Sequence, residues 1–136
     1  MKIFITGGAG YVGSVITSEF LKKGYKITVL DNFIYNNQFA VAPYVGDSNY
    51  KIINGDMGDY NLLERLSKDI SDVIILSGLV GDPITKKYPK YSLDYNEKDI
   101  MNIMKLGSRL KVPKIIFVST CSNYGIVNKK FLANEN

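Results

Sequence analysis

Three glycines spaced three residues apart have the clearest chemical meaning in the sequence. Gly7, Gly10 and Gly13 follow the apolar residues 3–5 and lead directly into a helical pattern. A strand, a glycine-rich turn and a helix in this order are typical of a site for the pyrophosphate of a dinucleotide, because glycine permits the turn, the approach of backbone to the phosphates and close helix packing. The start of the helix adds unpaired N–H groups and a positive dipole end. We therefore predict a dinucleotide site here; the alternative is a tight turn without a ligand.

Acidic residues near the ends of the next two apolar stretches are candidates for binding the adenosine half of that ligand. Asp31 ends the stretch 26–31. A carboxylate there accepts hydrogen bonds from the ribose hydroxyls and repels a 2′-phosphate, which predicts NAD rather than NADP. Asp56 follows residues 50–54 and is a second candidate, at the adenine edge. Each has a simpler alternative, an aspartate that caps a helix or stabilises a turn.

Polar residues near the ends of two later apolar stretches are candidates for contacts with the reacting part of the ligand. Ser77 and Gly78 come at the end of the fourth stretch, and Thr120 follows the fifth. In doubly wound sheets, ligands bind outside the carboxyl ends of the strands, where the strand order reverses. Thr120 is expected either to hydrogen-bond a substrate hydroxyl or carbonyl, or to cap a turn. Asn96 falls in the first turns of a predicted helix, and the sequence leaves open whether it faces solvent or the sheet.

Five apolar stretches that alternate with helical patterns hold these residues in place. The unbroken apolar character of the first stretch, residues 3–6, predicts a strand buried on both faces, as in a parallel sheet covered by helices. The pattern therefore predicts an α/β fold with a doubly wound parallel sheet and the strand order 3-2-1-4-5. The expected strands are residues 3–6, 26–31, 50–54, 72–77 and 114–119.

Three helices are expected to cover this sheet, at residues 11–23, 60–68 and 92–111. Gly24 is a suitable C-cap for the first helix, and Asp59 a suitable N-cap for the second. Residues 32–49 and 79–83 are expected to be connections, the first with room for one short helical turn. The side chains expected to face inward are Val12, Val15, Ile16, Phe20 and Leu21 on the first helix, Leu62, Leu63 and Leu66 on the second, and Ile100, Ile103, Met104 and Leu106 on the third.

Composition excludes several other classes of function. The chain has 136 residues, no histidine and one cysteine, Cys121, so Ser-His and Cys-His nucleophiles and the common soft-metal sites are excluded. No charged leader precedes the first strand, and no apolar run approaches the 18 to 20 or so residues of a membrane span, so we expect a cytoplasmic protein. The net charge of +4 comes from dispersed lysines, which favours solvated helix faces over a nucleic-acid surface.

Together, these segments resemble the extended short-chain dehydrogenase/reductase family, and within it the NAD-dependent nucleotide-sugar epimerases and dehydratases. The resemblance covers essentially the whole chain and implies NAD as cofactor, a nucleotide-sugar substrate and the N-terminal Rossmann part of such an enzyme. It rests on residues 6–13, 29–32, 55–56, 76–83 and 119–125.

The resemblance also implies a role for individual positions. Asn96 corresponds to the family's helix asparagine, which has a structural or active-site-positioning role. Thr120 corresponds to the catalytic Ser/Thr, which hydrogen-bonds the sugar hydroxyl or keto oxygen. The implied cofactor-binding residues are Gly7, Gly10, Tyr11, Val12 and Gly13 at the pyrophosphate, Asp31 at the ribose with Asn32 beside it, Asp56 and Met57 beside the adenine, and Leu76, Ser77 and Gly78 along the cofactor.

Two departures from the family pattern shape the functional prediction. Cys121 and Ser122 stand where the family's dehydratases have an Asp-Glu pair, which favours epimerisation or simple oxidation. The family's catalytic Tyr-x-x-x-Lys is expected about 25 residues after Thr120, beyond Asn136. We therefore expect the cofactor-binding part of a longer enzyme, inactive alone, or a fifth strand whose edge a partner chain or second copy covers. The alternatives are a non-catalytic NAD-binding module, such as a redox sensor or the cofactor subunit of a split enzyme, or an oligomerisation piece.

Overall fold

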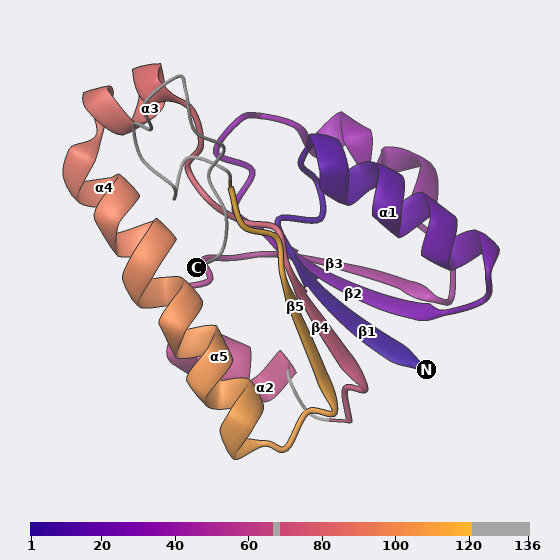
Figure 1. Ribbon diagram of the computed structural model, residues 1–136. Helices are drawn as coiled ribbons and strands as arrows, with labels where there is room; N and C mark the ends of the chain where they lie inside the picture. Colours follow the sequence, from indigo (N-terminus) through magenta and orange to yellow (C-terminus); the bar gives the residue numbers. More distant parts are fainter. Residues whose placement is uncertain (67–68, 121–136) are drawn as a thin grey trace, which may run out of the picture.

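A single parallel sheet forms the centre of the computed structural model, which describes residues 1–66 and 69–120 (Figure 1). Its strand order is β3-β2-β1-β4-β5, which confirms the predicted doubly wound topology. β4 and β5 each end two residues earlier than predicted. The strands are β1 (Lys2–Thr6), β2 (Lys26–Asp31), β3 (Tyr50–Asn54), β4 (Asp72–Ile75) and β5 (Lys114–Phe117).

Helices lie on both faces of this sheet (Figure 1). Helix α1 packs on one face, and α2 and α5 lie on the other. Two short 3-10 turns, η1 (Gln38–Ala40) and η2 (Ala42–Tyr44), occur in the connection after β2, where the sequence predicted room for one. The helices are α1 (Tyr11–Lys22), α2 (Tyr60–Leu66), α3 (Asp82–Lys87), α4 (Pro89–Leu93), the π-helical segment η3 (Asp94–Asp99) and α5 (Ile100–Arg109).

Helix α1 packs on the sheet with part of the predicted stripe, because Ile16, Phe20 and Leu21 pack against the core as predicted. Gly13 and Thr17 are its buried residues, whereas Val12 is 50% and Val15 60% exposed. The expected burial of these two valines was therefore wrong, because the helix approaches the sheet through Gly13 and Thr17. The C-terminal end follows the prediction: the Gly24 N–H donates to the Leu21 carbonyl over 2.9 Å, in a Schellman-type end.

The helical region on the other face is more broken than predicted. In place of the single helix expected at 92–111, the structure has three consecutive segments, α4, η3 and α5. A further helix that was not predicted, α3, directly precedes α4. Ile100, Ile103 and Leu106 of α5 are buried as predicted. Asp59 caps α2 as predicted, accepting the Leu62 N–H over 3.0 Å.

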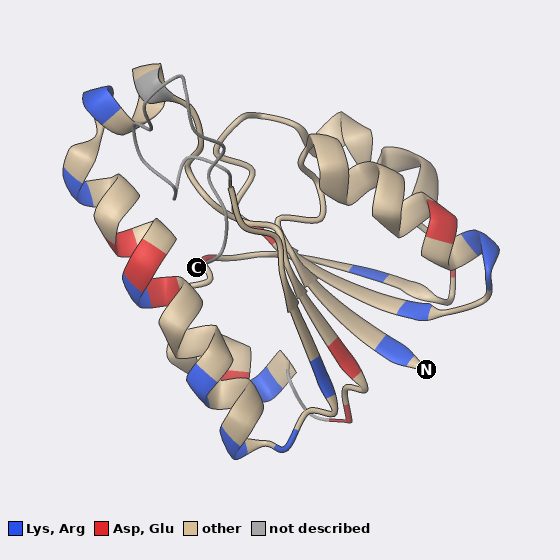
Figure 2. Cartoon of the chain, viewed as in Figure 1, with Lys and Arg blue, Asp and Glu red and all other residues tan. Residues whose placement is uncertain are grey.

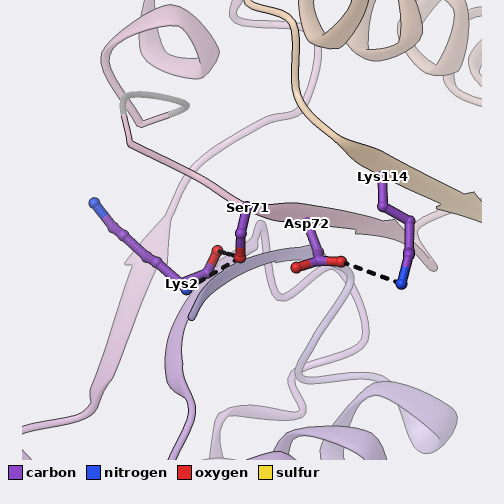
Figure 3. A network of polar contacts seen from close by, with 4 residues as sticks. All are labelled: Lys2, Ser71, Asp72 and Lys114. Carbon is purple, nitrogen blue, oxygen red and sulfur yellow. Dashed lines mark hydrogen bonds and ion pairs between the residues drawn. The ribbon is translucent and has the colours of Figure 1, made fainter.

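The amino ends of the strands form a polar edge away from the glycine turn (Figure 3). Lys114 of β5 lies opposite Asp72 of β4 in the strand register, and its Nζ is 3.8 Å from an Asp72 oxygen. The Ser71 hydroxyl donates to the Lys2 carbonyl over 3.0 Å. The first residue of β1, β2 and β5 is a lysine. Acidic residues are instead concentrated in η3 (Figure 2).

Strand β5 is at the edge of the sheet among the described residues, and Ile116 and Phe117 are partly exposed there. The covering of this edge by a partner chain or second copy stays a prediction. Cys121 and Ser122 lie outside the described residues. In the described part of the chain, no helix is long and apolar enough to cross a membrane.

Candidate functional site

The glycine turn is held tightly between the ends of β2 and β4. Thr6, the last residue of β1, lies opposite Leu30 in β2 and Ile75 in β4. The Gly7 N–H donates to the Leu30 carbonyl over 2.9 Å, and Gly7 has a φ of +73°. A Cβ at Gly7 would lie 2.6 Å from the Ser77 nitrogen. The turn therefore requires glycine here for both its backbone conformation and its space.

The amino end of α1 leaves its first backbone N–H groups free of competing side chains. Gly10 is the N-cap residue and supplies no side-chain cap, and the first turn carries no acidic residue. Tyr11 is 94% exposed, so this end of the helix is open on the outside of the turn. Gly13 packs against the turn itself, since a Cβ there would collide with the Gly7 carbonyl oxygen. The arrangement provides N–H donors and a positive dipole end suited to an anion.

Two adjoining hollows meet at this turn. The first is a cavity of about 90 Å³ at the carboxyl ends of the strands, and the second is a cleft of about 630 Å³ beside the start of α1. The predicted residues that line the cavity are Gly7, Gly10, Asp31, Asn32, Met57, Leu76, Ser77 and Gly78. Those that line the cleft are Gly7, Gly10, Tyr11, Val12, Gly13, Leu76 and Gly78.

Asp31 holds the turn as well as lining the cavity. One carboxylate oxygen accepts the Ala9 N–H over 3.0 Å, and the other accepts the Phe33 N–H over 2.9 Å. A carboxylate has about four acceptor positions, so each oxygen can accept a further hydrogen bond from a ligand. The acid therefore fixes the glycine turn relative to the end of β2 and presents negative charge to the cavity.

Asp56 lies at the rim of the cavity, between the lining residues Gly55 and Met57. One of its oxygens accepts the Gly58 N–H over 2.8 Å, and the other accepts the hydroxyl proton of Tyr95. That same hydroxyl accepts a hydrogen bond from the Asn32 amide over 2.7 Å. Burial, together with the Asp56 carboxylate, raises the pKa of Tyr95, so its hydroxyl keeps its proton and remains a donor.

Ser77 and Asn96 contact the backbone and side chains around the cavity. The Ser77 hydroxyl lies 2.6 Å from the Thr6 hydroxyl and 2.8 Å from the sulfur of Met57, so it joins the ends of β1 and β4 to the loop after β3. The Asn96 amide accepts the Leu79 N–H over 2.9 Å and donates to the Leu79 carbonyl over 2.8 Å. Asn96 thus turns toward the sheet and fixes the loop after β4.

The structure does not bring all predicted site residues to the cavity lining. Asn96 does not line the cavity, although it binds Leu79, which does. Asp56 does not line it either, although its neighbours Gly55 and Met57 do. Thr120 lies exposed, three residues after β5, and is not part of the lining of either hollow. The contacts made beyond Thr120 fall outside the described residues.

Asn37 and Tyr95 are cavity residues that the sequence did not single out. The Asn37 amide donates to the Ala9 carbonyl over 2.6 Å, and Asn37 lines both hollows. Its carbonyl oxygen is buried and has no hydrogen-bond partner among the described residues. Buried polar atoms are normally paired, so this oxygen is an acceptor suited to a ligand hydroxyl or amine. No spacing rule would have selected either residue, because both contact the site across long sequence distances.

Asp99, near the Asp56 rim, gives the site a predictable dependence on pH. Burial raises the pKa of its carboxyl, Asp56 and Asp94 raise it further, and Lys98 opposes the shift. The folded state thus holds this proton more tightly than the unfolded chain, so the contribution to stability is present below about pH 4 and is lost as the pH rises through the folded pKa. We predict that Asp99→Asn raises the melting temperature by roughly 1 to 3 °C at pH 7 and not at pH 3.5.

The control for that variant is Asp94→Asn in the same segment. Lys98 lies 2.6 Å from Asp94 and lowers the pKa of its carboxyl, so Asp94 contributes stability above its ordinary pKa rather than below it. The Asp94 variant should show a difference of opposite sign at pH 7. Melting curves at the two pH values measure both, and an Asp99 variant that is less stable than the wild type at pH 7 would contradict the prediction.

Comparison with known proteins identifies relatives of this chain in sequence and in structure. The model of the NAD dependent epimerase/dehydratase family matches residues 3–136. The chain is 30% identical to UDP-glucuronic acid decarboxylase 1 of Danio rerio over 124 residues, which are 91% of this chain and 28% of that protein. It is also 30% identical to a UDP-glucose 4-epimerase sequence of Klebsiella pneumoniae, in an alignment 135 positions long that covers 92% of this chain and 93% of that sequence.

A solved structure gives the same fold. The UDP-glucose 4-epimerase of Thermus thermophilus, in complex with NAD, superposes with a TM-score of 0.84 and 25% identity, over 99% of this chain and 43% of that one. The chain spans 28% to 37% of the length of five of its curated relatives, so it corresponds to about a third of those proteins.

Proposed function

The chain belongs to the NAD dependent epimerase/dehydratase family, and on that premise we propose that it binds NAD across the glycine turn. The adenosine half occupies the cavity between Asp31 and the Asp56 rim, and the pyrophosphate lies against Gly10 and the start of α1. The nicotinamide half extends toward the cleft.

The fit of the described residues to NAD supports this proposal. Side chains at Gly7 or Gly13 would fill the space that the turn itself uses, so the backbone stays close to the cleft. The start of α1 has no acidic residue to repel a pyrophosphate. The unpaired Asn37 carbonyl oxygen and the acceptor positions left on Asp31 suit the donor hydroxyls of a ribose. The glycine turn carries the most weight, because its close packing at Gly7 and Gly13 leaves the uncapped start of α1 open to an anion.

We further propose that the substrate is a nucleotide sugar. NAD, when bound, supplies a hydride acceptor and donor for a sugar carbon. The described residues orient that cofactor, and Thr120 hydrogen-bonds the reacting hydroxyl or keto oxygen. The 136 residues contain no Tyr-x-x-x-Lys pair to exchange the hydroxyl proton, so we propose that the isolated chain binds NAD without turning over a nucleotide sugar.

Thermal shift and calorimetric titration test the binding proposal directly. NAD should raise the melting temperature in proportion to the logarithm of its concentration, because it binds the folded state alone. NADP should give a much smaller shift. Equal shifts with NAD and NADP, or none with NAD, would overturn the proposal.

One other function would use the same residues, that of a non-catalytic NAD-binding module, because the cofactor site of the described residues needs no catalytic pair to bind NAD. The two functions predict different results when a catalytic C-terminal segment is joined to the chain. If the chain is the cofactor-binding part of an enzyme, joining it to the corresponding C-terminal part of a relative should restore turnover of a nucleotide sugar. A correctly folded fusion that binds NAD and remains inactive would support the module instead.

Asn37→Ala tests the most specific element of the site. Removing the unpaired acceptor should weaken NAD binding about three- to tenfold, the value of one hydrogen bond in a partly enclosed site. Asn61→Ala is the matched control, because Asn61 is exposed on α2 and lines neither hollow. Calorimetric titration of the two variants measures the difference. An NAD affinity unchanged in the Asn37 variant would remove this residue from the site.

A further inference from the structure

The hydroxyl of Tyr95 joins two cavity segments that are far apart in the sequence. It donates to Asp56, in the loop after β3, and accepts from Asn32, in the loop after β2. Tyr95 itself lines the cavity from η3. We propose that Tyr95 is a positioning residue that holds Asp56 in the orientation that selects adenine, a role that rests on the proposed binding of NAD.

Tyr95 reaches the cavity from a π-helical segment. Tyr95 and its neighbour Asn96 both face the sheet ends, where Asn96 binds the backbone of Leu79. Consecutive residues of a regular α-helix point in directions about 100° apart, so two neighbours rarely serve one site; a π-helical turn alters that spacing and occurs often at functional sites. From η3, Tyr95 lines the cavity directly, and Asn96 binds the backbone of Leu79, which also lines it.

The ring of Tyr95 is fixed independently of its hydroxyl. It is 9% exposed, belongs to the core under α5, and stacks on Tyr91 with a centroid distance of 5.9 Å. A side chain held in this way loses little further freedom when its hydroxyl binds a partner. Because the ring is held in the core, its hydroxyl holds the Asp56 carboxylate at the cavity rim in one position.

Asp56 is held at both oxygens. The Gly58 N–H fixes one and Tyr95 fixes the other, and each oxygen keeps an acceptor position. A carboxylate fixed in this way accepts a hydrogen bond from an exocyclic amine, the group by which adenine differs from hypoxanthine. Without the hydroxyl, the carboxylate can rotate about its side-chain bonds, and the selectivity for the amine falls.

The test compares NAD with nicotinamide hypoxanthine dinucleotide, which has a carbonyl in place of the amine. The wild-type chain should bind NAD more tightly than this analogue. Tyr95→Phe should weaken NAD binding about tenfold, as expected for losing a hydrogen bond to a charged group, and should change binding of the analogue less than twofold. Tyr91→Phe, the same change on the exposed stacking partner, should leave both affinities unchanged.

Asp56→Asn separates failure of this inference from failure of the proposed function. Suppose that Asp56→Asn abolishes the preference for NAD over the analogue, while Tyr95→Phe keeps this preference. Asp56 then binds the adenine amine, and Tyr95 does not orient Asp56. A wild-type chain that binds both dinucleotides equally would overturn the role of Tyr95 but leave NAD binding intact, and one that binds neither would overturn the proposed function. Equal weakening of both ligands by Tyr95→Phe, or loss of folding in that variant, would assign the hydroxyl a purely structural role.

Discussion

Gly7→Ala is expected to cost about 2 to 5 kcal/mol of folding free energy and to abolish measurable NAD binding. An alanine at the observed φ of +73° adopts the left-handed conformation at a cost of about 1 to 2 kcal/mol. Its Cβ would also lie 2.6 Å from the Ser77 nitrogen and 2.8 Å from the Ser77 Cα, and such overpacking typically costs a further 1 to 3 kcal/mol. The strain falls on the backbone that faces the cofactor, so binding is lost with stability. Urea unfolding and NAD titration measure the two effects.

The variant Gly24→Ala separates the cost of the left-handed backbone conformation from the cost of overpacking. Gly24 has a φ of +78°, nearly that of Gly7, but no atom of the described residues lies within 4 Å of the position of its Cβ. It should lose only the conformational part, about 1 to 2 kcal/mol, and should bind NAD normally. Equal destabilisation by the two alanines would mean that the contact with Ser77 relaxes at no cost, contrary to the prediction.

The strand order and the glycine turn could be predicted because local sequence determines them. Apolar stretches alternate with helical patterns, and Gly7 follows the first of these stretches directly. A right-handed crossover then allows few arrangements of the sheet. Asp31 was predicted on the same local grounds, as the last residue of the second strand. Its additional hydrogen bond to the Ala9 N–H, 22 residues away, could not be predicted.

Two residues of the predicted α1 stripe, Val12 and Val15, are exposed, because hydrophobicity was taken as the sole sign of burial. The inward positions are Gly13, Ile16, Thr17, Phe20 and Leu21, of which Ile16, Phe20 and Leu21 were predicted. The two smallest of these allow the helix to approach the sheet closely, so tertiary packing overrides hydrophobicity. The expected burial of Val12 fails for the same reason.

The break in the predicted long helix and the role of Tyr95 have a common cause. No glycine or proline marks residues 94–99, so no local signal predicts a π-helical segment. The Asn32 and Asp56 contacts of Tyr95 span 63 and 39 residues, and the Asn37 contact with Ala9 spans 28. Contacts of this range depend on the assembled fold, and a single sequence carries no periodicity that encodes them.

Asp31→Ser is expected to weaken NAD binding about ten- to hundredfold and to weaken NADP binding much less, so the preference for NAD falls. The carboxylate supplies charged acceptors to the proposed ribose hydroxyls, and hydrogen bonds to charged groups are worth about 1.5 to 3 kcal/mol. NADP avoids much of this loss, because removal of the negative charge also removes its repulsion of the 2′-phosphate. Titration of each variant with both dinucleotides gives the ratio of the two dissociation constants.

The Asp31 variant also loses the acceptor for the Ala9 N–H, so a control must distinguish loss of the turn from loss of the ribose contact. Asp47→Ser removes a comparable local contact, since Asp47 accepts the Asn49 N–H over 2.8 Å but lines neither hollow. The Asp47 variant should keep the wild-type preference for NAD. A disturbed glycine turn would weaken NAD and NADP equally, because both share the pyrophosphate. Only the ribose contact predicts an unequal loss, so equal weakening in Asp31→Ser would mean that the acid supports the turn and does not select the cofactor.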